Sequence, residues 1–406
     1  MNTEETQFAA LQQRLQNVFP TASVVLVQQL YEGFRRRTDE FVLLVEVTQA
    51  EETSPVVVKL GPADRLEKEL TAWQSCRPAG LKHDLVLMDL EPLRDAQGIL
   101  TALVYADAEQ LIGVDQTLSL EAAMQDAIRL GEPTLESVAD VLFQMYERLG
   151  LLLYKHSFVD HVKADATREQ RLLWLDGHLE ENLNAWSVLS GDAFNLRSGI
   201  TTDLDATKEE KNGYHDPVNV FQHVLKDSTP TSEIPNLLRG RSHGDLHGRN
   251  VLVGKVGRRV LWPAVYDYGD MSRQNLIAWD FVKMETELKI RVYPWLFSSG
   301  QLAIDVVRFE VKLHKETEQS RERGHWPEKP DSASPEDRLF WLLLQIRRLA
   351  MRHLKQQGRI RRWLMEYYFV LSLYGLNSIR FQNLEPSELR CALLSSGCAA
   401  ARCFPP

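Results

Sequence analysis

Residues 243–254, HGDLHGRNVLVG, place two histidines, an aspartate and an asparagine close together and then continue into an apolar run. Asn250 follows Asp245 by five positions, and Asp267 comes later in AVYDYGD. A loop, a short hairpin and a second loop would bring these three side chains to one edge of the fold. A carboxylate there could orient and deprotonate a hydroxyl, while an asparagine and a second carboxylate could hold Mg²⁺. The spacing therefore favours phosphoryl-transfer chemistry.

Two other interpretations of this segment stay open. Asp and Asn also cap turns in ordinary loops. Alternatively, His243, Asp245 and His247 could bind zinc, because two histidines at this spacing with a carboxylate nearby are suitable ligands. No second ligand cluster stands out in the sequence, and zinc binding would leave Asn250 and Asp267 without a role.

The elements that must position these residues change character along the chain. The first part is rich in Val and Leu in short runs typical of strands, at residues 24–28, 41–48, 55–60, 85–88 and 100–105. Between the third and fourth runs, PADRLEKELTAW predicts one amphipathic helix. Beyond residue 115, apolar residues recur at three- and four-residue steps, which predicts helices at 118–128, 135–155, 168–188, 275–288, 300–314, 338–356 and 360–376.

Two stretches depart from this periodicity. Residues 190–216 are polar and loop-like, and residues 314–337 mix charge, Gly and Pro, which predicts an exposed insertion. We therefore expect residues 1–107 to form a small sheet with one helix and residues 108–406 to form a larger, mostly helical part.

The composition limits the classes of protein that fit. The chain has 406 residues, of which 44% are hydrophobic, so it can bury a large core. A net charge of −9 argues against a nucleic-acid-binding surface, and four cysteines without CxxC spacing suggest neither disulfides nor a zinc site. The polar, acidic N-terminus and the lack of a long apolar run disfavour export and membrane insertion. We expect a cytoplasmic protein without nucleic-acid or membrane partners.

The motif HGDLHGRN, followed by Val-Leu-Val and an aromatic-flanked Asp267, resembles the catalytic loop (243–250) and metal loop (267–270) of the aminoglycoside phosphotransferase family. That family is a branch of the protein-kinase-like fold. WDFVKMETELK with the later EYYFVLSLYGLNSIR resembles more closely the phosphotransferase-like ternary-complex-associated domains of bacterial signalling or conflict proteins. The resemblance implies a bilobal α+β fold, with an antiparallel-sheet N-lobe at 1–107 and a helical C-lobe at 108–406.

The resemblance also implies roles for upstream residues. Lys59 ends the strand PVVVKL, where the family places the lysine that holds the α- and β-phosphates. The next helix offers Glu67 and Glu69 as its partner, and we expect Glu69, because Trp73, one turn on, belongs to the apolar face. Taken alone, Lys59 could also extend into solvent.

Other nucleotide contacts are less specific. Gly33 is a single glycine where protein kinases have G-x-G-x-x-G, and the arginines at 35–37 could clamp phosphates or form a solvated turn. Tyr105 and Asp107, in LVYADAE, lie at the expected hinge that meets the adenine ring. Arg249 could add positive charge near the phosphoryl group or lie in solvent.

The sequence therefore predicts an enzyme that transfers the γ-phosphate of ATP or GTP, with Mg²⁺, to a hydroxyl of an unidentified small molecule or protein. Asp245, Asn250 and Asp267 would be catalytic, with Asn250 and Asp267 as metal ligands. The alternative is a catalytically weak, kinase-like nucleotide sensor or regulatory domain of a bacterial signalling or conflict system. Besides nucleotide and acceptor, such a system would supply protein partners.

Overall fold

The computed structural model divides by packing into two compact units. Unit 1 consists of Met1–Ala127, Gly131–Lys155 and Arg241–Arg273, and unit 2 of Ile128–Leu130, His156–Gly240 and Gln274–Pro406. The predicted lobe boundary between residues 107 and 108 stays a prediction. The structure describes residues 3–31, 40–49, 51–78, 86–105, 113–187, 192–205, 212–226, 228–298, 301–330, 334–355, 363–381 and 384–404.

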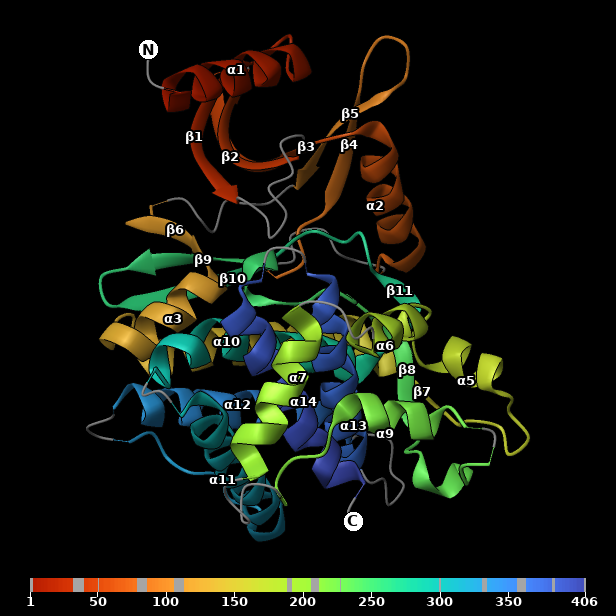
Figure 1. Cartoon of the computed structure of the whole chain (residues 1–406). Helices are drawn as coiled ribbons and strands as arrows, with labels where there is room; N and C mark the ends of the chain where they lie inside the picture. The colour runs from red at the N-terminus through yellow and green to blue at the C-terminus, as the bar shows by residue number, and fades with distance from the viewer. Residues whose placement is uncertain are drawn as a thin grey trace. The chain divides into compact units, whose positions relative to one another are not determined.

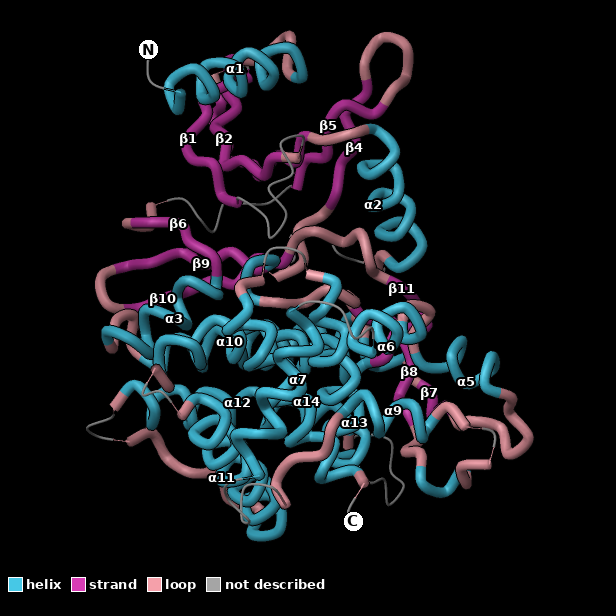
Figure 2. Tube along the Cα trace, viewed as in Figure 1, coloured by secondary structure: helices cyan, strands magenta, loops and turns pink. Residues whose placement is uncertain are grey.

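Unit 1 contains a five-stranded antiparallel sheet in the order β1-β2-β3-β5-β4 (Figure 1). Its strands are β1 (Ser23–Tyr31), β2 (Phe41–Gln49), β3 (Glu52–Leu60), β4 (Leu90–Arg94) and β5 (Leu100–Tyr105). Helix α1 (Thr3–Val18) packs at the β1 end, and α2 (Ala63–Cys76) packs against β4 and β5 (Figure 2).

The alternation of side chains along each strand determines which residues lie on each face of this sheet. In β3 and β5, one set of alternate residues joins Leu11 and Leu15 of α1 in an apolar cluster: Val58, Leu60, Ala102 and Val104. Successive side chains of a strand point to opposite faces. Lys59 and Tyr105, on the other set, therefore lie on the face away from α1.

The HGDLHGRN segment leads into a second sheet of unit 1. Its order is β10-β9-β6, with β6 at Gln116–Ser119, β9 at Val251–Val256 and β10 at Arg259–Val265. Helix α3 (Leu120–Leu130) follows β6, and α4 (Leu135–Leu152) packs on β10, where Val260 N donates to Ser137 Oγ (3.2 Å). The end of HGDLHGRN, Gly248–Asn250, is a short 3-10 turn that enters β9 directly. The third sheet, β11-β8-β7, comprises Ser272–Leu276, Leu237–Ser242 and Phe158–Asp160.

Unit 2 is mostly helical. Among its described residues, the α-helices are α5 (Arg168–Leu175), α6 (Leu179–Ser187), α7 (Asp192–Asp205), α9 (Pro217–Val224), α10 (Ile277–Leu296), α11 (Leu302–Arg323), α12 (Pro335–Leu354), α13 (Trp363–Asn377) and α14 (Pro386–Cys403). Every residue of α13 from Tyr367 to Asn377 is buried, and the helix packs against α10 and α14. A helix that is covered on all sides forms the centre of a helical core.

The core of unit 2 also contains a fully buried polar network. Arg347 of α12 donates to Glu285 of α10 (2.6 and 3.0 Å), and Lys289 lies 2.6 Å from Glu285 and 2.8 Å from Glu310 of α11. Two carboxylates and two cations balance in charge. Because Arg347 also donates to His314 Nδ1 (3.1 Å), the His314 proton lies on Nε2, 3.7 Å from Glu310. Buried charges are tolerated when they are paired in this way.

The structure confirms the predicted α+β class and corrects four details. The expected strand at 85–88 is absent from its described part, 86–88, and the fourth strand is β4 instead. Helix α1 and helix α14 were not predicted, because α1 is largely polar and α14 is rich in Ala, Ser and Cys, without clear periodicity. Residues 192–205 of the expected loop form α7.

The fourth correction concerns the expected insertion at 314–337. Its first ten residues, 314–323, continue α11 instead of forming a loop. The residues that α11 buries there are polar: His314, Thr317 and Ser320. These buried residues have helical spacing, but because they are polar, a search for periodic apolar residues does not detect the helix. Among the described helices, none is long and apolar enough to cross a membrane.

We predict that His314 makes folding sensitive to mild acid. Burial, followed by the charges of Arg347, Lys289 and Arg402, holds the pKa of His314 well below its ordinary 6.5. The unfolded chain therefore binds a proton below pH 6.5 that the folded chain excludes, and stability present above this pH is lost as pH falls, by about 1.4 kcal/mol per pH unit. His314→Gln should flatten this loss in urea unfolding between about pH 7 and about pH 5. Exposed His325, changed to Gln, is the control, and equal slopes for both variants would contradict the prediction.

Candidate active site in unit 1

The HGDLHGRN segment forms a tightly bonded loop around Asp245 and Asn250. Asn250 Nδ2 donates to the Asp245 backbone oxygen (2.9 Å) and to its carboxylate Oδ2 (3.3 Å). The loop closes on itself where Asn250 N donates to His247 O (3.0 Å). Asn250 is buried, whereas the Asp245 side chain is 30% exposed, so the carboxylate is held in place and remains accessible.

His243 orients this loop. Its Nε2 lies 3.0 Å from Tyr266 O, which can only accept, and its Nδ1 accepts from Asp245 N (3.2 Å). The ring is therefore a neutral tautomer with the proton on Nε2. Since both nitrogens are engaged by the backbone, His243 has no lone pair to offer to zinc. The zinc interpretation of His243, Asp245 and His247 therefore loses a ligand.

Two glycines in the motif are required by the backbone. Gly244 has φ +80°, a left-handed conformation that favours glycine. A Cβ on Gly248 would lie 2.7 Å from the backbone nitrogen of Glu121, at the start of α3. The loop can approach α3 this closely only because position 248 has no side chain.

Arg249 has neither of the roles considered from the sequence. Its guanidinium is buried and donates to Glu121 Oε2 (2.7 Å), so it is not solvated and does not line the cavity described below. The pair ties the loop to α3, while Tyr266 OH donates to Arg249 O (2.6 Å). A buried carboxylate and guanidinium compensate each other's lost hydration.

Lys59 lies between two carboxylates. Its Nζ donates to Glu69 Oε2 (2.7 Å) and to Asp267 Oδ1 (2.9 Å). Glu69 is the partner expected from the sequence; Glu67 instead has a side chain that is 43% exposed and pairs with Arg94 (2.5 Å). Strand β3, helix α2 and the loop at Asp267 thus meet at one ammonium group.

Burial and charge act against each other in this cluster. Burial alone would lower the pKa of Lys59, but the charges of Asp267 and Glu69 raise it above its ordinary value, so the lysine stays protonated. Burial would raise the pKa of Asp267, but Lys59 lowers it overall, and Asp267 is ionised at neutral pH. Burial raises the pKa of the more enclosed Glu69, although Lys59 opposes this shift.

Asp267 is held by the residue that follows it. Its φ of +62° is uncommon for a residue with a side chain. Tyr268 anchors the turn: its N donates to Glu69 Oε1 (2.8 Å), its OH donates to Val265 O (2.6 Å), and Trp73 of α2 stacks on its ring at 4.3 Å. The aromatic packing keeps the Asp267 backbone in this conformation.

These side chains surround a cavity of about 400 Å³ within unit 1. Nearly all of its lining residues are charged: Glu40, Lys59, Arg65, Lys68, Glu69, Asp245, Asp267, Gly269 and Asp270 line it. At its edge, Lys68 pairs with Asp270 (2.9 Å) and Arg65 with Glu40 (3.4 Å). Sequence reasoning missed Glu40, Arg65 and Lys68, which carry no motif, whereas Asp270 belongs to the expected metal loop (267–270).

The donor set fits a hard cation such as Mg²⁺. Asn250 uses Nδ2 to bond Asp245, so its carbonyl oxygen is the atom that could bind a metal, and ionised Asp267 supplies a carboxylate. No group of three or more His, Cys, Asp or Glu that could hold a metal exists among the described residues. Mg²⁺ commonly binds one or two protein oxygens plus phosphates and water. Asn250 and Asp267 suit that mode.

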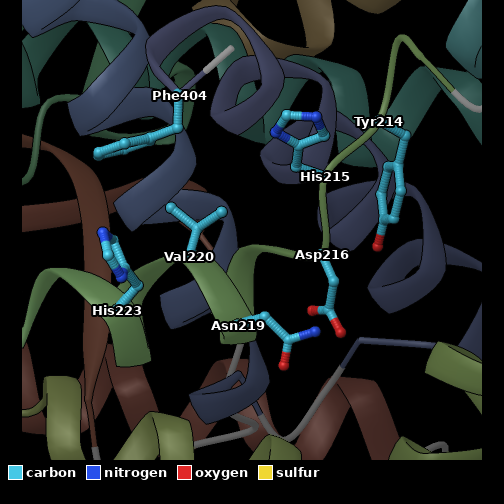
Figure 3. A pocket seen from close by; sticks show the side chains of 7 residues that line it. All are labelled: Tyr214, His215, Asp216, Asn219, Val220, His223 and Phe404. Carbon is cyan, nitrogen blue, oxygen red and sulfur yellow. The ribbon is translucent and has the colours of Figure 1, made fainter. Parts of the chain in front are cut away.

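Unit 2 has a cavity of about 410 Å³, lined by Tyr214, His215, Asp216, Asn219, Val220, His223 and Phe404 (Figure 3). Asp216 caps α9 by accepting from Val218 N (3.0 Å) and also accepts from Arg197 (2.5 Å). Its described lining includes no Lys or Arg that could bind phosphate. The cavity of unit 1 is therefore the candidate for phosphoryl transfer.

The structure gathers most of the predicted site residues. Lys59, Glu69, Asp245 and Asp267 line the same cavity, and Asn250 is bonded to Asp245. Tyr105 is fully buried with its hydroxyl on Glu69, a contact that was not predicted. Gly33, the arginines at 35–37 and Asp107 lie outside the described residues, so their roles stay predictions.

Gly248→Ala should destabilise the protein. The added Cβ meets the Glu121 backbone, which cannot move aside like a side chain, so we expect a loss of about 1–3 kcal/mol. Gly199→Ala is the control, since its Cβ meets nothing within 4 Å and α7 tolerates alanine. Urea unfolding of both variants checks this. Wild-type stability for Gly248→Ala would mean that the loop does not pack this closely on α3.

Solved structures similar to this chain include small-molecule kinases. A glucosamine kinase in complex with glucosamine, ADP and inorganic phosphate is 16% identical, with a TM-score of 0.41 over 95% of this chain and 81% of that one. Choline kinase from Cryptosporidium parvum Iowa II is 10% identical (TM-score 0.34; 96% and 93% covered), and Plasmodium vivax ethanolamine kinase is 11% identical (TM-score 0.33; 91% and 81% covered). At these identities the likeness concerns the fold alone.

Among curated proteins, none matches the sequence significantly. Residues 167–380 match the family model described as Ternary complex associated domain 9. The matched region includes Asp245, Asn250 and Asp267, whereas Lys59 and Glu69 precede it. The predicted resemblance to ternary-complex-associated domains is thereby confirmed. Since the model matches more than half of the chain, this protein belongs to the ternary complex associated domain 9 family.

Proposed function

We propose that this chain is a phosphotransferase that moves the γ-phosphate of ATP or GTP to a hydroxyl of an acceptor. One observation carries the proposal: Lys59, Asp245 and Asp267 line a single cavity, and Asn250 is hydrogen-bonded to Asp245. The resemblance of HGDLHGRN to the aminoglycoside phosphotransferase loop supports it. The acceptor is a small molecule or a protein.

Lys59 would bind the nucleotide phosphates. A lysine ammonium has three N–H donors. Glu69 and Asp267 accept from two of them, at 2.7 and 2.9 Å, which leaves one for a phosphate oxygen. The same carboxylates keep the lysine charged, and a charged donor binds phosphate more strongly than a neutral one.

Asp245 would be the catalytic base. It accepts the acceptor's hydroxyl proton as the acceptor oxygen forms a bond to the γ-phosphorus, while the bond from that phosphorus to the bridging oxygen breaks and the nucleoside diphosphate leaves. Asn250 Nδ2, at 3.3 Å from Oδ2, fixes the direction of this carboxylate. Orientation of this kind accounts for much of the rate enhancement in phosphoryl transfer.

Asn250 and Asp267 would hold Mg²⁺. When bound, the metal offsets the negative charge of the phosphates. The contribution of the chain is to keep Asp267 ionised through Lys59 and to keep the amide oxygen of Asn250 available by using Nδ2 for Asp245. A kinase-like nucleotide sensor is the second candidate, because the family description names association into a complex and not catalysis.

Asp267→Asn should weaken binding of MgATP by more than about tenfold, because it removes the charged oxygen ligand. Asparagine tolerates the left-handed backbone at this position, so the fold should survive. Calorimetric titration measures the affinity, with Asp126→Asn, on the exposed side of α3, as the control. Equal affinities for Asp267→Asn and wild type would exclude Asp267 as the metal ligand.

Asp245→Asn should keep MgATP affinity within a few-fold and lower phosphate transfer by more than about a hundredfold, because the base is lost while Lys59 and Asp267 remain. Transfer of radiolabelled γ-phosphate to fractions of cell extract measures this, with Asp126→Asn again as the control. If wild type binds MgATP but shows neither transfer nor hydrolysis above Asp245→Asn, the catalytic proposal fails and the sensor takes its place.

A further inference from the structure

Tyr105 occupies the end of β5, and its whole side chain is buried. Its hydroxyl donates to Glu69 Oε1. Lys59 donates to the other oxygen of the same carboxylate, Oε2, at 2.7 Å. Tyr105 therefore does not face the cavity; it supports Lys59 from behind, through Glu69.

Sheet register explains why the three side chains meet. Tyr105 pairs with Val57 across β3 and β5, and Lys59 lies two residues further along β3. Residues two apart share a face, so Tyr105 and Lys59 are diagonal neighbours on one side of the sheet. Helix α2 packs against β5 and brings the buried Glu69 to this pair.

We propose that Tyr105 is a positioning residue for nucleotide binding: by holding Glu69 Oε1 it keeps Oε2 directed at Lys59, and so sets where the Lys59 ammonium lies. This inference rests on the proposed function in one respect only, namely that Lys59 binds nucleotide phosphates. It adds to that function a residue that never touches the nucleotide.

The hydrogen bonds at Glu69 support this role. Oε1 accepts from Tyr105 OH and from Tyr268 N (2.8 Å), and Oε2 accepts from Lys59. Burial, and then the charge of Glu69, raise the pKa of Tyr105 well above its ordinary value, so the phenol keeps its proton. Without this hydroxyl, Oε1 keeps only the backbone donor, and the flexible Glu69 side chain can rotate. Lys59 would then be oriented mainly by Asp267.

A purely structural hydroxyl would behave differently. It would lower stability when removed but leave the position of Lys59, and hence the MgATP affinity, unchanged. The ring itself has a packing role, because it contacts Tyr266 and Tyr268 at centroid distances of 5.9 Å. Tyr105→Phe retains the ring and removes only the hydroxyl. Tyr146→Phe deletes another fully buried hydroxyl of unit 1, on α4, and serves as the matched control.

The test is a double-mutant cycle on MgATP affinity, measured by calorimetry. Tyr105→Phe should weaken binding about tenfold, since a hydrogen bond to a charged group is worth more than about 1.4 kcal/mol. In a Glu69→Ala background, Tyr105→Phe should have no further effect beyond about twofold, because the partner is gone. Tyr146→Phe should leave affinity unchanged in both backgrounds. Should Glu69→Ala not fold, Glu69→Gln replaces it, and the effect of Tyr105→Phe should shrink.

Three outcomes would overturn the inference: wild-type affinity for Tyr105→Phe, an equal loss with and without Glu69, or no MgATP binding by wild type. The proposed catalysis is separable from it. If the cycle is non-additive but wild type transfers no phosphate, the phosphotransferase proposal fails while the role of Tyr105 in nucleotide binding stands.

Discussion

The candidate site depends on one buried carboxylate, that of Glu69. It accepts hydrogen bonds from Lys59 of β3, Tyr105 of β5 and the backbone of Tyr268. A buried charge that loses its partners lowers the free energy of unfolding by about 3–5 kcal/mol, so separation of these segments would destabilise the fold. Through Glu69, the packing of α2 on the sheet sets the position of the ammonium group and of the loop that carries Asp267.

Backbone geometry has the corresponding role at Asp245. Gly244 allows a left-handed turn and Gly248 allows close approach to α3, so these two glycines determine the backbone path of the loop. Asn250 and His243 then hold Asp245 by its side chain and its backbone nitrogen. Part of the carboxylate stays exposed and lines the cavity of unit 1. A functional group is thus oriented by neighbours that are themselves buried, as precise chemistry requires.

Much of the site could be predicted because its residues occur in a recognisable order. A strand-end lysine, a glutamate on the next helix and HGDLHGRN followed by a strand and Asp267 each have a local signal. Arg249 shows the limit of such reasoning. Its charge suggested a phosphate contact or solvent, but Glu121, distant in sequence, pairs with it. Nothing in the sequence predicted the buried network at Glu285, Arg347 and His314, because charged residues ordinarily lie on the protein surface.

The sequence by itself determined the alternation of β3 and β5, the helical spacing beyond residue 115 and the glycine that the left-handed turn at position 244 requires, because these are local properties of the backbone and of neighbouring side chains. Only the tertiary structure decided that Tyr105 donates to Glu69, that Tyr268 stacks on Trp73, and that α11 buries polar residues. Each of these depends on which distant segment lies opposite. Packing across the fold brings hydrogen-bond partners and compensating charges together. The spacing of residues along the chain therefore does not predict which residues pair.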